Sequence, residues 1–405
     1  MAQPTPSEAP RYASAPFDDP TADLILRTSD LVDFRVFRVI LRLASPVFAS
    51  MLEVGQAPPV AADGSQTGSD DLRDGCPVVP VQEDSTTLDS LLRIIYPTKD
   101  PAFGGLLSLH PVVAAALKYE MEEAVMLGSA TLLLFVPKEP LSVWAIAVRN
   151  GLETEARAAA EEMNRQGLSV LDAFPAEMQD ITAGAYYRLL QYRRLEGKVE
   201  DTFEFRFPPV LSPSPPLSPL ASVVSPQSRV QTFTDVICRS SDMREFPAHR
   251  AFLAFASPVM AAMLTSLPAA SQACDVPVLT FEEDGITLKA LIDLCRPIAD
   301  RDARQFLELP KLDDALKKYE MDVAMEVLQR QWSRLVASDP LRAYLLAATR
   351  KSSSQMRQAA LRLLDRTLED YYVPALESSP SSIYRNALLY HRACKTTACD
   401  IAQVL

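Results

Sequence analysis

The sequence has little of what catalytic and metal-binding sites usually require. Its 405 residues include three histidines, six cysteines and 12 glycines, and the glycine motifs GxGxxG, GxxxxGK[ST] and GxSxG are absent. The histidines His110, His249 and His391 lie far apart. The one close cysteine pair, Cys394 and Cys399, has no second pair to complete a zinc site. The sequence therefore predicts no enzyme, no metal and no cofactor.

Long hydrophobic runs and dense basic clusters are also missing. No run approaches the ~20 apolar residues of a membrane-spanning helix, and residues 1–10 lack the features of a secretory signal. The formal net charge of −12 would repel a nucleic-acid backbone. Sparse cysteines favour a reducing compartment. We therefore expect a cytoplasmic and/or nuclear protein that binds neither membranes nor nucleic acids.

What the sequence does contain is an internal repeat. Residues 23–52 align without a gap with residues 235–264, and 15 of the 30 positions are identical. Residues 77–160 align in the same way with residues 277–360. The first copy carries 12 extra residues before position 77, in a stretch rich in Gly, Ser and Asp that is typical of a surface loop. This repeat predicts two related modules in tandem.

Each copy has the pattern of a few short strands followed by many helices. Residues 23–27 and 235–239 favour a first strand, a second strand follows as a hairpin, and residues 78–81 and 276–281 favour a third. The next segment of copy one has helical spacing, with Val36, Val39, Ile40 and Leu43 apolar. This order predicts an α+β module with a helical extension in each copy.

Two kinds of polar residue mark the expected helix starts. Ser45-Pro46 and Ser257-Pro258 combine an N-cap serine with a proline at the first helical position. The acidic pairs that precede a later helix in each copy are better explained as cap and first-turn charges than as catalytic carboxylates. These pairs are Glu83-Asp84 and Glu283-Asp284.

The boundaries follow from the repeat and from a proline-rich segment between the copies, which indicates a linker. We predict a disordered tail at 1–19, module 1 at 20–131, helical extension 1 at 132–206, a Pro/Ser-rich linker at 207–231, module 2 at 232–332 and helical extension 2 at 333–405.

A set of residues at the start of each copy has a recognisable order and spacing: Phe246, His249, Arg250, Ser257 and Pro258 in copy two, with Ser45 and Pro46 in copy one. In this order the residues of copy two resemble the signature of the BTB/POZ domain. Later segments, such as residues 115–121 and 140–152, are similar to the expanded fungal (basidiomycete-type) BTB families. Copy one departs from the pattern, because Phe37 stands at the position of the histidine. The resemblance implies a tandem BTB/POZ protein.

Such a resemblance implies protein partners rather than a reaction. We expect a scaffold that recruits partners or self-associates between or within chains, including as an intramolecular pseudo-dimer. The alternatives are a substrate adaptor of a cullin-type ubiquitin ligase and a transcriptional co-regulator. The candidate interaction residues are Phe48, Met51, Met260 and Met263. Core packing is the alternative role for methionines on these helices.

Overall fold

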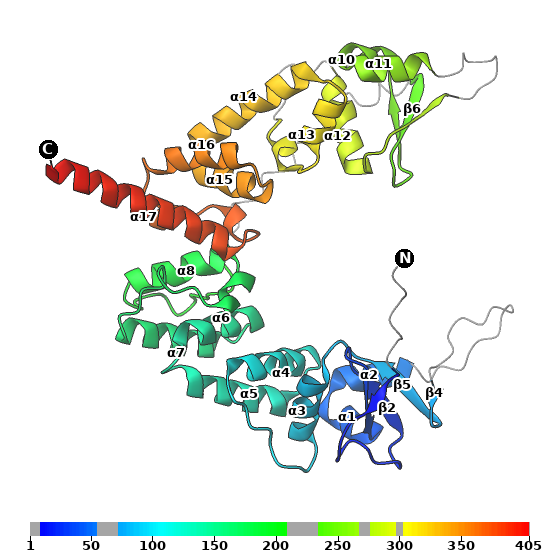
Figure 1. Ribbon diagram of the computed structural model, residues 1–405, viewed down its shortest axis with the longest axis vertical. Helices are drawn as coiled ribbons and strands as arrows, with labels where there is room; N and C mark the ends of the chain where they lie inside the picture. The colour runs from blue at the N-terminus through cyan, green and yellow to red at the C-terminus, as the bar shows by residue number, and fades with distance from the viewer. Residues whose placement is uncertain (1–8, 55–71, 209–233, 267–275, 297–302, 405) are drawn as a thin grey trace. The chain divides into compact units, whose positions relative to one another are not determined.

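The chain divides into two compact units, which are described separately. The computed structural model describes residues 9–54, 72–208, 234–266, 276–296 and 303–404, without the side chains of 398–404 (Figure 1). Unit 1 comprises Met1–Ile181 and Arg188–Phe207, and unit 2 comprises Thr182–Tyr187 and Pro208–Leu405. No helix among the described residues is long and apolar enough to span a membrane.

Unit 1 contains a five-stranded sheet with the order β1-β3-β2-β5-β4. Strands β2 and β3 form the expected hairpin, and β5 lies parallel to β2 on its other side. A short strand covers each edge, because β1 pairs with β3 and β4 pairs with β5. The strands are β1 Arg11–Tyr12, β2 Leu24–Arg27, β3 Val32–Val36, β4 Leu72–Arg73 and β5 Cys76–Pro80.

Helices cover this sheet and then continue away from it (Figure 1). The core forms where apolar side chains of the strands, such as Leu26 and Phe34, meet those of the helices, such as Leu41 and Leu91. The helices are α1 Arg38–Ala44, α2 Pro46–Val54, α3 Ser85–Ile95, α4 Leu106–Lys118, α5 Glu122–Phe135, α6 Pro140–Asn150, α7 Glu153–Arg165, η1 Ala176–Asp180 and α8 Ala183–Arg194, of which the first residues group with unit 2.

Unit 2 repeats this order of elements with a smaller sheet. The described sheet has three strands in the order β7-β6-β8: β6 Val236–Arg239, β7 Glu245–Ala248 and β8 Val278–Thr280. The helices are α10 Arg250–Ala256, α11 Pro258–Thr265, α12 Gly285–Cys295, η3 Ala303–Glu308, α13 Leu312–Lys318, α14 Asp322–Ser338, α15 Pro340–Thr349, α16 Ser353–Leu363, η4 Leu368–Asp370, η5 Pro374–Leu376 and α17 Ser381–Val404.

The predicted boundaries need two corrections. The limits at 131/132 and 332/333 pass through the middle of α5 and α14. Both helices continue because buried apolar residues, such as Leu132 and Leu335, fall on the same helical face beyond those limits. The predicted linker at 207–231 lies outside the described residues except for Phe207 and Pro208.

The predicted disordered tail at 1–19 is also wrong over its described part. Residues 11–12 form β1, and the side chain of Phe17 is fully buried. Its ring centroid lies 5.7 Å from that of Phe34 and 5.3 Å from that of Tyr96. A large aromatic side chain buries enough apolar area to order a short terminal segment.

We predict that Phe17→Ala destabilises unit 1 by about 3 kcal/mol, because the substitution leaves a cavity between the buried ring of Phe34 and the half-buried ring of Tyr96. Urea denaturation of the full chain measures this change. The matched control is Phe207→Ala, since Phe207 is 56% exposed and its removal should change stability by less than about 0.5 kcal/mol. Equal effects of the two substitutions would contradict an anchored N-terminal segment.

Candidate functional site

The described side chains form no metal-binding group. Among them, no cluster of three or more His, Cys, Asp or Glu side chains could hold a metal ion. His110 on α4 is half-buried, and burial lowers its pKa. His391 on α17 contacts the backbone oxygen of Arg366 at 2.9 Å. Cys238 and Cys295 are buried, which raises the pKa of each thiol to about 12 and makes both poor nucleophiles.

A buried serine joins the two helical layers in each unit. In unit 1 the Ser45 hydroxyl donates to the backbone oxygen of Tyr119 at 2.5 Å and accepts from the Phe48 N–H at 3.0 Å. The prediction that this serine begins the helix is therefore confirmed. Its second bond ties the start of α2 to the end of α4.

The same bonds recur in unit 2. The Ser257 hydroxyl donates to the backbone oxygen of Tyr319 at 2.5 Å and accepts from the Met260 N–H at 3.0 Å. The serine at the start of α2 or α11 thus binds the tyrosine that ends α4 or α13 in the same way in both units. Because the contact recurs, we infer that it fixes how these helices are placed in both units.

A charged cluster supports the same tyrosine in unit 1. The Tyr119 hydroxyl donates to Glu83 Oε2 at 2.6 Å, and Lys118 Nζ donates to Glu83 Oε1 at 2.8 Å. Burial would raise the pKa of Glu83, but these two hydrogen bonds outweigh burial and hold it below its ordinary value. Burial and the bond to Glu83 raise the pKa of Tyr119. The cluster is fully paired and therefore structural.

Unit 2 has the equivalent cluster. Glu283 accepts from the Tyr319 hydroxyl at 2.6 Å and from Lys318 Nζ at 2.7 Å. The prediction that these acidic residues act at the helix start is therefore wrong for Glu83 and Glu283, since both bind a lysine and a tyrosine instead.

The second residue of each acidic pair follows the prediction. Asp84 accepts from the Thr87 N–H at 2.8 Å, and Asp284 accepts from the Thr287 N–H at 2.9 Å. Each aspartate is thus the N-cap of the helix that follows, α3 or α12. The backbone bond and Lys311 lower the pKa of Asp284 to about 2.

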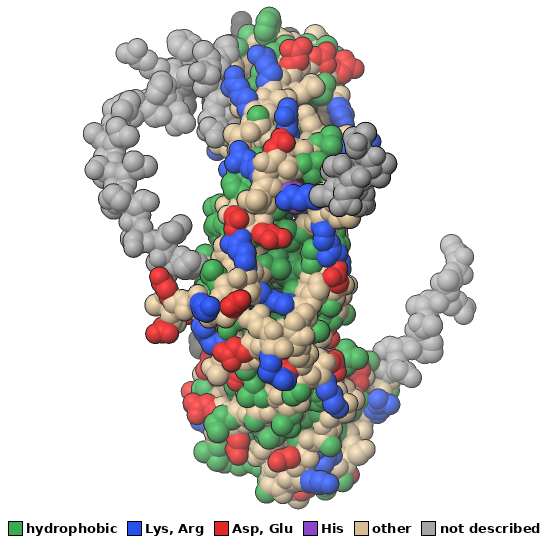
Figure 2. Space-filling view, turned by 90° about the vertical axis from the view of Figure 1, so that its left-hand side faces the viewer, with side chains coloured by type: hydrophobic (Ala, Val, Ile, Leu, Met, Phe, Trp, Pro, Cys, Tyr) green, Lys and Arg blue, Asp and Glu red, His purple; other side chains and the backbone are tan. Residues whose placement is uncertain are grey.

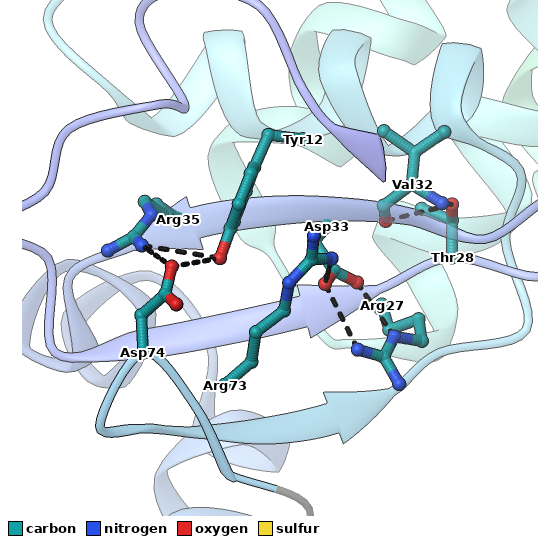
Figure 3. Close-up of polar contacts among 8 residues, drawn as sticks. All are labelled: Tyr12, Arg27, Thr28, Val32, Asp33, Arg35, Arg73 and Asp74. Carbon is teal, nitrogen blue, oxygen red and sulfur yellow. Dashed lines mark hydrogen bonds and ion pairs between the residues drawn. The ribbon is translucent and has the colours of Figure 1, made fainter. Parts of the chain in front are cut away.

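Unit 1 has a further polar network that crosses its sheet (Figure 3). Arg27 donates two hydrogen bonds to the buried Asp33 carboxylate, at 2.7 and 3.0 Å, and Arg73 on β4 binds the same carboxylate. Arginine paired with a carboxylate in this two-bond geometry is among the stronger polar contacts. The pairs hold β4 against the central hairpin.

The same network holds β1. The Tyr12 ring lies between the guanidinium groups of Arg35 and Arg73, at 4.8 and 4.1 Å from the ring centroid. Its hydroxyl donates to Asp74 Oδ2 at 2.5 Å, and Arg35 donates to the same oxygen at 2.6 Å. The network therefore fixes both edge strands of the unit 1 sheet. Among the described residues of unit 2, the equivalent of the Arg27–Asp33 pair is Arg239 with Glu245.

Apolar side chains reach the surface among charged ones (Figure 2), and one such surface occurs in both units. On α1, Leu43 is 84% exposed and Val39 is 61% exposed. On α10, Phe255 at the position equivalent to Leu43 is 92% exposed. A solvated, charged pair at the rim, Arg42 with Glu53 at 2.9 Å, lies beside the first of these faces. We name the surface that contains Val39 and Leu43 the α1–α2 face, and the surface that contains Phe255 the α10–α11 face.

The predicted interaction residues divide between core and surface. Phe48 and Met260 are 1% and 0% exposed, so their assignment to a binding surface was wrong. Both follow the capping serine by three residues, and this places them on the inner side of the helix. Met51 is exposed on α2, and Met263 is half-buried on α11.

The most exposed apolar residues of these two faces, Leu43 and Phe255, are not among the candidates predicted from the sequence. Helical spacing alone grouped Leu43 with Val36 and Ile40, yet the residue of α1 that is buried is Leu41. A comparison of the copies contains the missing signal. Leu41 is again leucine in copy two, as Leu253, which is also buried, whereas Leu43 has become Phe255.

The remaining signature residues have local roles. His249 precedes α10, and its ring meets that of Phe252 edge to face at 5.4 Å. The backbone N–H of Arg250 donates to Asp235 at 2.7 Å, and the equivalent Arg38 N–H donates to Asp23 at 2.8 Å. The ring contact with Phe252 thus gives His249 a packing role, and the N–H bond of Arg250 fixes the start of α10.

Comparison with known proteins identifies one domain in the chain. Residues 225–296 match the BTB/POZ domain family, a class of protein–protein interaction domains. No curated protein matches the chain significantly. The match covers β6 to α12, which includes the α10–α11 face. A protein-interaction domain therefore contains one of the two exposed apolar faces.

We predict that Asp33→Asn destabilises unit 1 by about 2 kcal/mol at pH 7, because it weakens the pairs with Arg27 and Arg73. Burial would raise the pKa of Asp33, but both arginines hold it below its ordinary value. The carboxylate therefore stabilises the fold above about pH 4, and this contribution is lost as the pH falls through the folded-state pKa.

Urea denaturation at pH 7 and at about pH 3 tests this sign, and the gap between wild type and variant should narrow at the lower pH. The control is Asp89→Asn, which removes an i,i+4 pair with Arg93 on a more solvated surface and should cost less than about 0.5 kcal/mol. A gap that widens in acid would contradict the assignment.

Proposed function

We propose that the protein is a non-enzymatic scaffold that binds other proteins through two BTB-like modules. The observation that carries the proposal is the equivalent exposure of Leu43 and Phe255 on the first helix of each repeat. Exposed apolar patches rimmed by polar residues mark interaction sites. Since one face lies in the BTB/POZ domain, the proposal assigns the same activity to its counterpart.

The conservation of the frame between the copies supports the tandem arrangement. Both units have a capping serine bonded to a tyrosine carbonyl, and both have the Glu–Lys–Tyr cluster beneath it. Two copies of one fold would be expected to retain such hydrogen bonds at equivalent positions. The proposal therefore treats unit 1 as a second BTB-like module with a more elaborate sheet.

Partner binding includes pairing of the two faces within one chain or between chains. Equivalent faces can pair by a local two-fold relation, as in isologous interfaces. The adaptor and co-regulator alternatives remain predictions. Neither has support among the described residues, and Glu53, the one acid in α2, is bonded to Arg42.

We predict that Leu43→Asp combined with Phe255→Asp removes most bound protein from the chain, because a buried aspartate would remain unpaired at each interface centre. The measurement is affinity purification of the tagged full chain from its native cells, with partners quantified by mass spectrometry. Each bound partner that uses these faces should fall at least tenfold.

The matched control is Leu361→Asp, since Leu361 is an exposed leucine on α16 and belongs to neither face. It should leave the bound set unchanged. Circular dichroism and thermal melting of all variants check that the fold is retained. Retention of every partner by the double variant would contradict the proposed faces.

A further inference from the structure

The outer side of α5 in unit 1 is unusually apolar for a solvated helix. Met126 is 72% exposed, Leu134 is 76% exposed and Leu133 is 38% exposed. Ala130, which is also exposed, lies between them. These positions follow the i, i+4, i+7 spacing of one helical side. We name this surface the α5 stripe.

The equivalent helix of unit 2 shows that the fold does not require an apolar stripe. The positions of Met126, Ala130 and Leu134 are occupied in α14 by Glu326, Arg330 and Arg334. All three of these charged residues are exposed, so the positions face solvent in both units. Folding therefore does not explain the apolar residues in copy one, and binding does.

The charges around the α5 stripe are arranged symmetrically. Met126 and Leu134 lie four residues on either side of Ala130, and Glu122 and Lys138 lie eight residues on either side. Glu122, the adjacent Glu123 and Lys138 are exposed, and none forms an ion pair with another described residue. Lys138 lies in the turn directly after α5, which ends at Phe135. A second α5 running antiparallel about Ala130 would therefore place Met126 opposite Leu134, and Glu122 at the start of one helix near Lys138 just beyond the end of the other.

We propose that two copies of this chain associate through antiparallel packing of their α5 stripes about a two-fold axis at Ala130. The small alanine side chain lets two helices approach closely at the crossing point, and the flanking ion pairs set the antiparallel direction. This surface is distinct from the α1–α2 and α10–α11 faces, so the proposal does not depend on the proposed function.

The contact is small, because one helix of 14 residues supplies most of it. Interfaces below ~1,200 Å² are typical of weak or transient complexes. We therefore expect a dimer with a dissociation constant in the micromolar range. Sedimentation equilibrium of the full chain, from roughly 1 to 100 micromolar, measures this constant.

The first test transfers the residues of copy two into copy one. The triple variant Met126→Glu, Ala130→Arg, Leu134→Arg should weaken association at least tenfold and keep the thermal transition of wild type. These substitutions are matched to the fold, because α14 already carries the same residues at the same exposed positions. A dimer that persists unchanged in the triple variant would overturn the proposal, as would a monomeric wild type.

The second test asks whether the partner helix is a second α5 and whether it runs antiparallel. Lys138→Glu alone and Glu122→Lys alone should each weaken the dimer severalfold, because each places like charges opposite one another. The two substitutions in one chain should restore association, since the pairs then form with reversed sign. Failure of this rescue would exclude the antiparallel arrangement.

The third test separates this contact from the α1–α2 and α10–α11 faces. The Leu43→Asp, Phe255→Asp variant should retain the dimer that depends on α5. Dissociation of the dimer by that variant, with no effect of the α5 triple variant, would assign self-association to those faces and overturn the proposal.

Discussion

The hydroxyl of one buried serine in each unit decides how the helices are placed. Ser45 caps α2 and at the same time reaches the carbonyl of Tyr119, which ends α4. The side chain thereby satisfies a donor at one helix start and an acceptor at another helix end, groups that would be costly to bury unpaired. Because α1 leads directly into this junction, the junction determines which side of α1 faces the core and which side faces solvent. Leu41 then faces the core and Leu43 faces solvent.

The repeated carboxylates of this protein hold neighbouring elements together through hydrogen bonds and ion pairs. Because their oxygens are occupied in this way, they are not arranged as catalytic carboxylates. Glu83 is held by a lysine and a tyrosine, so its proton affinity is low and its oxygens are occupied. A catalytic carboxylate needs an accessible oxygen and a pKa close to the working pH. Glu83 and its counterpart Glu283 have neither, since hydrogen bonds hold the pKa of each below its ordinary value.

Much of the frame is predictable from the sequence, whereas the outer surface is not. The repeat, the serine caps and the β6–β7 hairpin of copy two depend on local chemistry that a single chain displays. The burial of Phe17 depends on contacts with residues far along the chain, so the polar segment around it indicated disorder instead. The outward direction of Leu43 required knowledge of which apolar residue the core accepts. That choice is made by packing and not by helical spacing.

The two copies differ at one edge of the sheet and on the outer side of one helix. In unit 1 the Arg35 N–H donates to the Phe17 oxygen at 2.9 Å, which closes the edge of the sheet with the N-terminal segment. The equivalent residue in unit 2 is Pro247, which has no N–H and so cannot receive a strand in this way. The same divergence separates the apolar α5 from the charged α14. The bonds of the capping serine and of the Glu–Lys–Tyr cluster are the same in both units, so they do not depend on whether the outer helix is apolar or charged. In the scaffold that we propose, two modules with the same internal contacts and different outer surfaces can bind different partners.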